Sequence, residues 1–237
     1  MTETKITTGS EVLDWLLEGG YEKDVLTTIY GPPGSGKSNI CLICLASQYD
    51  KKVIYIDTEG SFSVSRVKQL TDDYQAVLDN VMILKPTDFN EQRNVFEKLT
   101  KLVNDKIGLI IVDSIAMLYR LELGKTKEVY KVNRELGVQL ASLIQIARKH
   151  NIPVLLTNQV YADFEDKEKI NMVGGDILRY ASKCLIELQK TSKGKKAILR
   201  KHRSLPDNKE ILFKITNNGI EELNNVEDVQ NPKKTSE

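Results

Sequence analysis

The chain lacks the features that would indicate secretion, a membrane or a charge-driven partner. It has three cysteines in 237 residues, an odd number without a framework spacing, which is typical of a reducing cytosol. No hydrophobic run is long enough to cross a bilayer, and the first eight residues lack the basic and apolar regions of a secretory signal. A net charge of +1 gives no overall attraction to nucleic acid, so any DNA binding must come from local groups. We therefore expect a cytoplasmic protein without a membrane partner.

What the sequence does contain is the pattern of an α/β protein. Short apolar runs alternate with segments of helical period, which predicts a mainly parallel twisted sheet with helices on both faces. From residue 183 onward the pattern changes to strands joined by short turns, which predicts antiparallel strands added to that sheet. The expected strands cover residues 25–30, 52–56, 81–84, 109–112 and 153–157, and the expected helices cover 39–47, 90–103 and 129–149. We predict one domain over residues 1–223 and a polar, disordered tail over 224–237.

Residues 31–38 fit the phosphate-binding pattern G-x-x-x-x-G-K-[ST], between an expected apolar strand and an expected apolar helix. Glycines let backbone N–H groups converge on phosphate oxygens, and the helix N-terminus adds the positive end of a dipole. In this pattern Lys37 reaches the β- and γ-phosphates of ATP, and Ser38 offers its hydroxyl to Mg²⁺. The sequence therefore predicts ATP and Mg²⁺ as cofactors. The expected nucleotide-binding residues are Gly31, Pro32, Pro33, Gly34, Ser35, Gly36, Lys37, Ser38 and Asn39.

Three polar residues follow expected strands, at the edge where open α/β sheets bind ligands. Asp113 comes directly after an apolar strand, which predicts a carboxylate that holds Mg²⁺ directly or through water. Glu59 follows the second strand and can orient and deprotonate the attacking water. Gln159 follows the fifth strand, where its amide can hydrogen-bond the γ-phosphate and change position when that phosphate is lost. The alternative for each is an ordinary turn or loop residue; the expected catalytic residues are Lys37, Glu59 and Gln159.

The order of these residues, each at a strand end, resembles the RecA/RadA family of recombinase ATPases. The resemblance extends over nearly the whole chain, because residues 6–20 look like the family's entry segment and residues 55–62 like the archaeal and eukaryotic version of the second strand. It implies a RecA-like P-loop ATPase core in which Arg66 stacks on adenine. Residues 157–160, followed by Gly174 and Gly175, look like the strand and loop that contact DNA.

Two departures narrow the resemblance. We expect a protein that begins at the ATPase core, without the N-terminal DNA-binding domain and the polymerisation linker of full recombinases. In addition, residues 201–203 read Lys-His-Arg where archaeal strand-exchange recombinases carry Asp-Ala-Pro. Both features are similar to the short archaeal paralogues within this family.

The segment 190–203 is strongly basic and contains no acidic residue. One interpretation is a basic hairpin on DNA phosphates, and another is a merely solvated hairpin. In the interpretation that we favour, Lys201 and Arg203 are two apart on a strand and so share a face. The resemblance to RecA-like and related hexameric ATPases implies that such a pair reaches the γ-phosphate of an adjoining subunit. There they would act as trans sensors that stabilise transition-state charge, as an arginine finger does. Residues 193–196 would then form a solvated or DNA-facing turn.

The resemblance also places two DNA-contacting loops near residues 120–131 and 161–175. The first combines cations with the ring of Tyr130, a mixture that suits single-stranded DNA. The second is net negative, which is poor for gripping phosphates and argues against strand exchange. Its charged residues are Asp163, Glu165, Asp166, Lys167, Glu168 and Lys169. The expected DNA-binding residues are Arg120, Lys125, Lys127, Lys131, Gly174 and Gly175.

These observations predict an accessory protein of DNA repair and homologous recombination. We expect it to bind ATP and single-stranded or branched DNA, to hydrolyse ATP slowly and to lack autonomous strand exchange. The expected partners are a full-length RadA-type recombinase or other recombination proteins, and further copies of the chain. The alternative is a filament- or ring-forming DNA-dependent ATPase that carries out strand exchange. A clock-type P-loop regulator or a small-molecule kinase fits less well, because the chain has one copy of the core and no arginine-rich lid.

Overall fold

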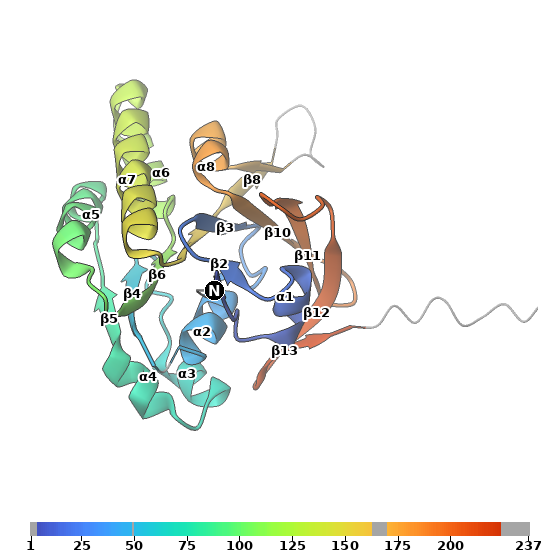
Figure 1. Cartoon of the computed structure of the whole chain (residues 1–237). Coiled ribbons are helices and arrows are strands. Elements are labelled where there is room, and N and C mark those ends of the chain that lie inside the picture. The colour runs from blue at the N-terminus through green and yellow to red at the C-terminus, as the bar shows by residue number, and fades with distance from the viewer. Residues whose placement is uncertain (1–3, 49, 163–169, 224–237) are drawn as a thin grey trace, which may run out of the picture.

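A nine-stranded sheet forms the centre of the molecule (Figure 1). The computed structural model describes residues 4–48, 50–162 and 170–223. Along the sheet the strands are β13 (Gly219–Glu222), β12 (Glu210–Thr216), β11 (Lys195–Lys201), β10 (Cys184–Lys190), β3 (Leu26–Tyr30), β7 (Val154–Asn158), β6 (Ile107–Asp113), β4 (Lys52–Asp57) and β5 (Val81–Leu84). Strands β10 to β5 are parallel to one another, and β11, β12 and β13 continue the sheet in antiparallel fashion. The predicted fold class is confirmed.

Helices cover both faces of this sheet because its strands are apolar on both faces. In β4, Ile54 and Ile56 pack into one core cluster, whereas Val53 and Tyr55 pack into the other. The first cluster is completed by α5 (Phe89–Leu102), α6 (Met117–Leu123), α7 (Val129–His150) and α8 (Gly175–Ala181). The second is completed by α1 (Glu11–Leu16), α2 (Lys37–Ala46), α3 (Val64–Leu70) and α4 (Tyr74–Asn80).

Local signals define the ends of the longer helices. The Asp88 side chain accepts a hydrogen bond from the backbone N–H of Glu91, while the Glu91 carboxylate accepts one from the N–H of Thr87. This reciprocal capping begins α5. Helix α7 ends where Asn151 takes a left-handed conformation (φ 51°), after a basic last turn. The short helices α3, α4, α6 and α8 were not predicted, because seven residues carry too few apolar positions to show a period.

Two small antiparallel pairs lie beside the main sheet: β1 (Lys5–Ile6) with β2 (Tyr21–Glu22), and β8 (Val160–Ala162) with β9 (Ile170–Met172).

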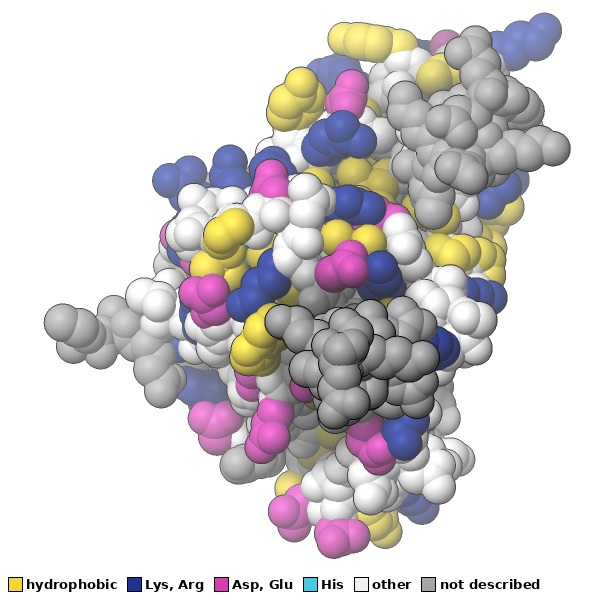
Figure 2. Space-filling model, turned by 90° about the vertical axis from the view of Figure 1, so that its right-hand side faces the viewer, with side chains coloured by type: hydrophobic (Ala, Val, Ile, Leu, Met, Phe, Trp, Pro, Cys, Tyr) yellow, Lys and Arg dark blue, Asp and Glu magenta, His cyan; other side chains and the backbone are white. Residues whose placement is uncertain are grey.

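Two segments named in the sequence analysis lie outside the described residues: the six charged residues of the second expected DNA loop, within 163–169, and the predicted disordered tail, 224–237. Within the described ranges, no helix is long and apolar enough to cross a membrane. On the face that carries the C-terminal strands, basic and acidic side chains are interspersed (Figure 2).

Candidate nucleotide-binding site

The predicted phosphate loop connects the end of β3 to the start of α2. Gly34 and Gly36 have φ values of 72° and 107°, in the left-handed region that favours glycine. The Lys37 ammonium donates hydrogen bonds to the carbonyl oxygens of Gly31 (2.8 Å) and Pro32 (3.1 Å). Burial lowers the pKa of Lys37, while the carboxylates of Glu59 and Asp113 act in the opposite direction. The loop is therefore built around a partly buried cation.

A pocket of about 220 Å³ opens over this loop and brings together residues that are far apart in the sequence. Its lining residues are Pro33, Gly34, Gly36, Lys37, Ser38, Asn39, Glu59 and Gln159. The predicted base and the predicted sensor thus face the predicted phosphate site, because β4 and β7 end at the same edge of the sheet as β3.

Glu59 is held in place by two neighbours. The Ser114 hydroxyl and the Gln159 amide both donate to its Oε1 atom, at 2.5 Å and 2.9 Å. The Oε2 atom makes no hydrogen bond to the described residues, which leaves it available to accept from water. Ser114 was missed in the sequence, although its place directly after Asp113 at the end of β6 could have indicated it.

Asp113 is 1% exposed and accepts hydrogen bonds on both carboxylate oxygens. Tyr55 (2.9 Å) and Ser61 (2.5 Å) donate to Oδ2, and Thr157 (2.5 Å) donates to Oδ1. Burial and the Asp113 charge raise the pKa of the Tyr55 hydroxyl, which keeps it a hydrogen-bond donor. A carboxylate oriented this way beside the phosphate loop has the chemistry to hold Mg²⁺ directly or through water, and the metal-binding role of Ser38 and Asp113 stays a prediction.

Arg66 lies in α3, where its guanidinium donates to the carbonyl oxygens of Thr216 (2.8 Å) and Asn217 (2.9 Å). The neighbouring Ile215 contacts the phosphate loop, since a Cβ atom on Gly36 would lie 2.8 Å from its Cδ1. Arg66 is thus fixed to the turn between β12 and β13, beside the loop. Its stacking on adenine stays a prediction.

Lys201 and Arg203 do not share a strand face, which corrects the sequence interpretation. Strand β11 ends at Lys201, and Arg203 lies beyond it. Lys201 is paired with the start of β10, at the opposite edge of the sheet from the phosphate loop. Its ammonium donates to the carbonyls of Arg179 (2.7 Å) and Ser182 (2.8 Å). Arg203 contacts Glu22 (2.8 Å) and Asp24 (3.2 Å).

The two expected DNA segments meet at one hollow of about 670 Å³. Arg120 of α6 lines it together with Gly174 and Gly175, and Tyr119 and Tyr161 contribute aromatic rings. The expected first loop is largely helical, because α6 and the start of α7 occupy it.

Not all of the expected DNA-binding cations line that hollow. Lys131 lines a separate hollow with Phe89 and Arg93 and forms an exposed ion pair with Glu128 (2.8 Å). Lys125 and Lys127 line neither of the two. Arg120 is therefore the predicted cation that lies with the two glycines.

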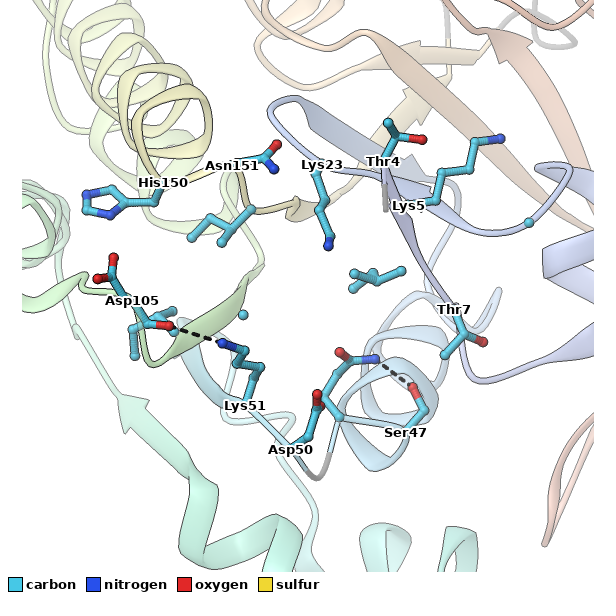
Figure 3. A pocket seen from close by; sticks show the side chains of 16 residues that line it. Thr4, Lys5, Thr7, Lys23, Ser47, Asp50, Lys51, Asp105, His150 and Asn151 are labelled. Atoms are coloured by element: carbon cyan, nitrogen blue, oxygen red, sulfur yellow. Dashed lines mark hydrogen bonds between the residues drawn. The ribbon is translucent and has the colours of Figure 1, made fainter. Parts of the chain in front are cut away.

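A cavity of about 990 Å³ lies at the opposite edge of the sheet and contains no predicted site residue (Figure 3). The side chain of Lys23 points into it, and Lys51 donates to the carbonyl of Asp105 (3.2 Å) at its rim. His150 and Asn151, at the end of α7, close another side. The phosphate site is thus separate from this cavity.

These features define a P-loop protein with a RecA-like core. The phosphate loop follows the first parallel strand, Asp113 ends β6, and Glu59 follows β4. A family profile described as Rad51 matches residues 2–223. The chain belongs to the Rad51 family.

Similar proteins and a solved structure narrow the assignment within the Rad51 family and confirm the resemblance to the short archaeal paralogues. The "DNA repair and recombination protein RadB" of Methanococcus maripaludis is 44% identical over 220 residues, which are 90% of this chain and 98% of that protein. The protein of the same name from Methanobrevibacter smithii is 41% identical over 226 residues, 91% of this chain and 95% of that protein. A crystal structure of the RadB recombinase superposes with a TM-score of 0.79 at 37% identity, covering 92% of this chain and 99% of that one.

Proposed function

We propose that this chain is an accessory protein of DNA repair and homologous recombination in which ATP·Mg²⁺ controls DNA binding. One observation carries the proposal: the phosphate loop, Glu59 and Gln159 line one pocket, next to a buried and fully hydrogen-bonded Asp113. In this proposal the loop backbone and Lys37 bind the phosphates, and Ser38 and Asp113 hold Mg²⁺. The metal ion supplies charge neutralisation for the phosphates.

Hydrolysis in this proposal depends on Glu59. Its free Oε2 atom orients the attacking water and takes its proton, while Ser114 and Gln159 hold the carboxylate through Oε1. Among the described residues that line the pocket, Lys37 is the one cation. The pocket lining of a single protomer therefore holds one cation, and we propose slow turnover without an adjoining subunit.

Lys201 and Arg203 are proposed as the cations that complete this site in an adjoining subunit. Their place at the opposite edge of the sheet supports the idea, since neither can reach the phosphate loop of its own chain. In a head-to-tail assembly, the two opposite edges of neighbouring copies meet. The homo-oligomer, the partner recombinase and a cytoplasmic location belong to the same proposal.

The proposed coupling to DNA runs through Gln159. The backbone N–H of Val173 donates to the Gln159 carbonyl (3.0 Å), and the Asn158 amide donates to the Val173 carbonyl (2.9 Å). Val173 directly precedes Gly174 and Gly175, which line the proposed DNA-binding hollow with Arg120. In this proposal a change at the γ-phosphate moves Gln159, and Val173, which is hydrogen-bonded to Gln159, transmits the movement to Gly174 and Gly175.

Titration of the full chain with a fluorescent ATP analogue and Mg²⁺ tests the nucleotide site. The wild-type chain is expected to bind it, and Lys37→Ala is expected to lose binding or weaken it severely. Equal affinity of the two proteins would show that the nucleotide site lies elsewhere.

A further inference from the structure

The outer side of the phosphate loop packs against the C-terminal strands at each of its glycines. A Cβ atom on Gly31 would lie 2.3 Å from the carbonyl oxygen of Leu188 in β10, and one on Gly36 would lie 2.8 Å from Ile215 in β12. At Gly34, the nearest atom would be the Lys190 ammonium, at 3.1 Å. These glycines therefore serve a second purpose besides phosphate binding: they let the C-terminal strands contact the loop.

Two lysines of these strands lie against the tip of the loop. Lys190 ends β10, Lys195 begins β11, and the two are paired in the register of the sheet. The Lys195 ammonium donates a hydrogen bond to the Gly34 carbonyl (2.7 Å). Neither lysine has a carboxylate partner among the described residues, and burial together with the Lys190 charge lowers the pKa of Lys195. With Lys37, three ammonium groups surround one phosphate loop.

The hydrogen bond from Lys195 restricts a peptide group that belongs to the loop. The Gly34 carbonyl belongs to the same peptide group as the Ser35 N–H, which donates to the Pro32 carbonyl (3.2 Å), so the hydrogen bond from Lys195 helps to hold the turn at the tip of the loop. A loop held in one conformation binds a phosphate more tightly, because less conformational freedom is lost on binding. The ammonium groups of Lys190 and Lys195 also attract a nucleotide more strongly the more negative charge its phosphates carry.

We propose that Lys195 is a positioning residue for nucleotide phosphates in its own protomer, which fixes the tip of the phosphate loop and, with Lys190, adds positive potential to the site. This inference rests on the proposed binding of ATP at the loop. The sequence interpretation of residues 193–196 as a solvated or DNA-facing turn is wrong at two positions, because Lys195 and Lys196 belong to strand β11.

The next residue in β11 provides a matched control. Lys196 points to the other face of the sheet and forms an ion pair with Glu210 (2.9 Å). Replacing it removes the same charge from the same strand without touching the loop. A comparison of Lys195→Met with Lys196→Met therefore separates contact with the loop from net charge.

The experiment measures the dissociation constants of ATP, ADP and AMP with Mg²⁺ at low and at high salt, for the full-length wild-type, Lys195→Met, Lys195→Arg and Lys196→Met chains. We expect Lys195→Met to weaken ATP binding roughly tenfold, ADP less and AMP least, with the loss larger at low salt. Lys195→Arg should retain most of the affinity, Lys196→Met all of it, and the melting temperature without nucleotide should be unchanged.

Two results would overturn the inference. One is a Lys195→Met chain with wild-type affinity for ATP. The other is an equal loss for all three nucleotides together with a lower melting temperature, which would indicate a structural role alone. A wild-type chain that binds none of the three nucleotides would overturn the proposed function as well, so the two failures are distinguishable.

Discussion

The Gln159 amide donates a hydrogen bond to the Glu59 carboxylate at 2.9 Å, although the two residues are 100 positions apart. Glu59 follows β4 and Gln159 follows β7, with β6 between these strands. The hydrogen bond therefore crosses the edge of the sheet above Asp113, the last residue of β6. It joins the proposed base to the residue whose backbone accepts a hydrogen bond from Val173, at the start of the proposed DNA-binding segment. In the proposed function, hydrolysis and DNA binding therefore share one contact.

Replacing Glu59 by Gln is expected to preserve ATP binding and abolish hydrolysis. Gln159 and Ser114 can still donate to an amide oxygen, so the side chain should stay in place, but an amide cannot take the proton from water. The measurement is single-turnover hydrolysis of ATP next to a binding titration. Ser114→Ala is the companion variant, with the base present but less well held, and should show an intermediate rate. Undiminished hydrolysis in Glu59→Gln would remove Glu59 as the base.

Replacing Asp113 by Ala is expected to lower stability as well as Mg²⁺-dependent ATP binding. The change leaves the hydroxyls of Tyr55 and Thr157 buried without an acceptor, which costs roughly 2–4 kcal/mol of unfolding free energy. Urea unfolding with and without ATP·Mg²⁺ measures both effects. The variant should be less stable and should gain no protection from the nucleotide. Full protection by ATP·Mg²⁺ would contradict the metal-binding role.

Lys201→Ala and Arg203→Ala are expected to remove any part of the ATPase rate that rises with protein concentration. These cations would act on the nucleotide of a neighbour, so the dilute protein should hydrolyse ATP at the wild-type rate. Lys214→Ala is a suitable control, because Lys214 forms an exposed ion pair with Glu221 of the neighbouring strand (2.7 Å). A defect already complete in dilute protein would argue for a role within one chain.

His202 is expected to make the fold sensitive to acid. Burial lowers its pKa from 6.5, and its Nδ1 atom accepts hydrogen bonds from the N–H groups of Ser204 and Leu205 (both 3.2 Å). Below about pH 6.5 the unfolded chain binds more protons than the folded one, so stability falls as the pH falls. His202→Asn, whose Oδ1 can accept the same bonds, should lose less stability between pH 7 and about pH 5. An unchanged slope in His202→Asn would contradict the assignment.

The sequence predicted the part of the site that depends on local patterns. The phosphate loop, Asp113, Glu59 and Gln159 were each recognisable because a short motif or a strand end marks them, and parallel strands bring their carboxyl ends to one edge. Contacts made by side chains across the sheet left no such signal. The hydrogen bond from Lys195 to Gly34 joins residues 161 positions apart, and nothing in the spacing of the basic segment distinguishes Lys195 from Lys196.

The error at Arg203 has a similar origin. Two residues separated by one position share a face only while the strand continues, and β11 ends at Lys201. The buried Glu22, which contacts Arg203, comes from the other end of the chain. Long-range ion pairs of this kind depend on the tertiary fold rather than on local periodicity.

The most direct test of the whole account is the DNA affinity of the full chain with and without ATP·Mg²⁺, measured for the wild type and for Lys37→Ala by fluorescence anisotropy with single-stranded DNA. We predict that ATP·Mg²⁺ changes the affinity of the wild type severalfold and leaves that of Lys37→Ala unchanged. Equal DNA affinity of the wild type with and without the nucleotide would contradict the claim that ATP controls DNA binding.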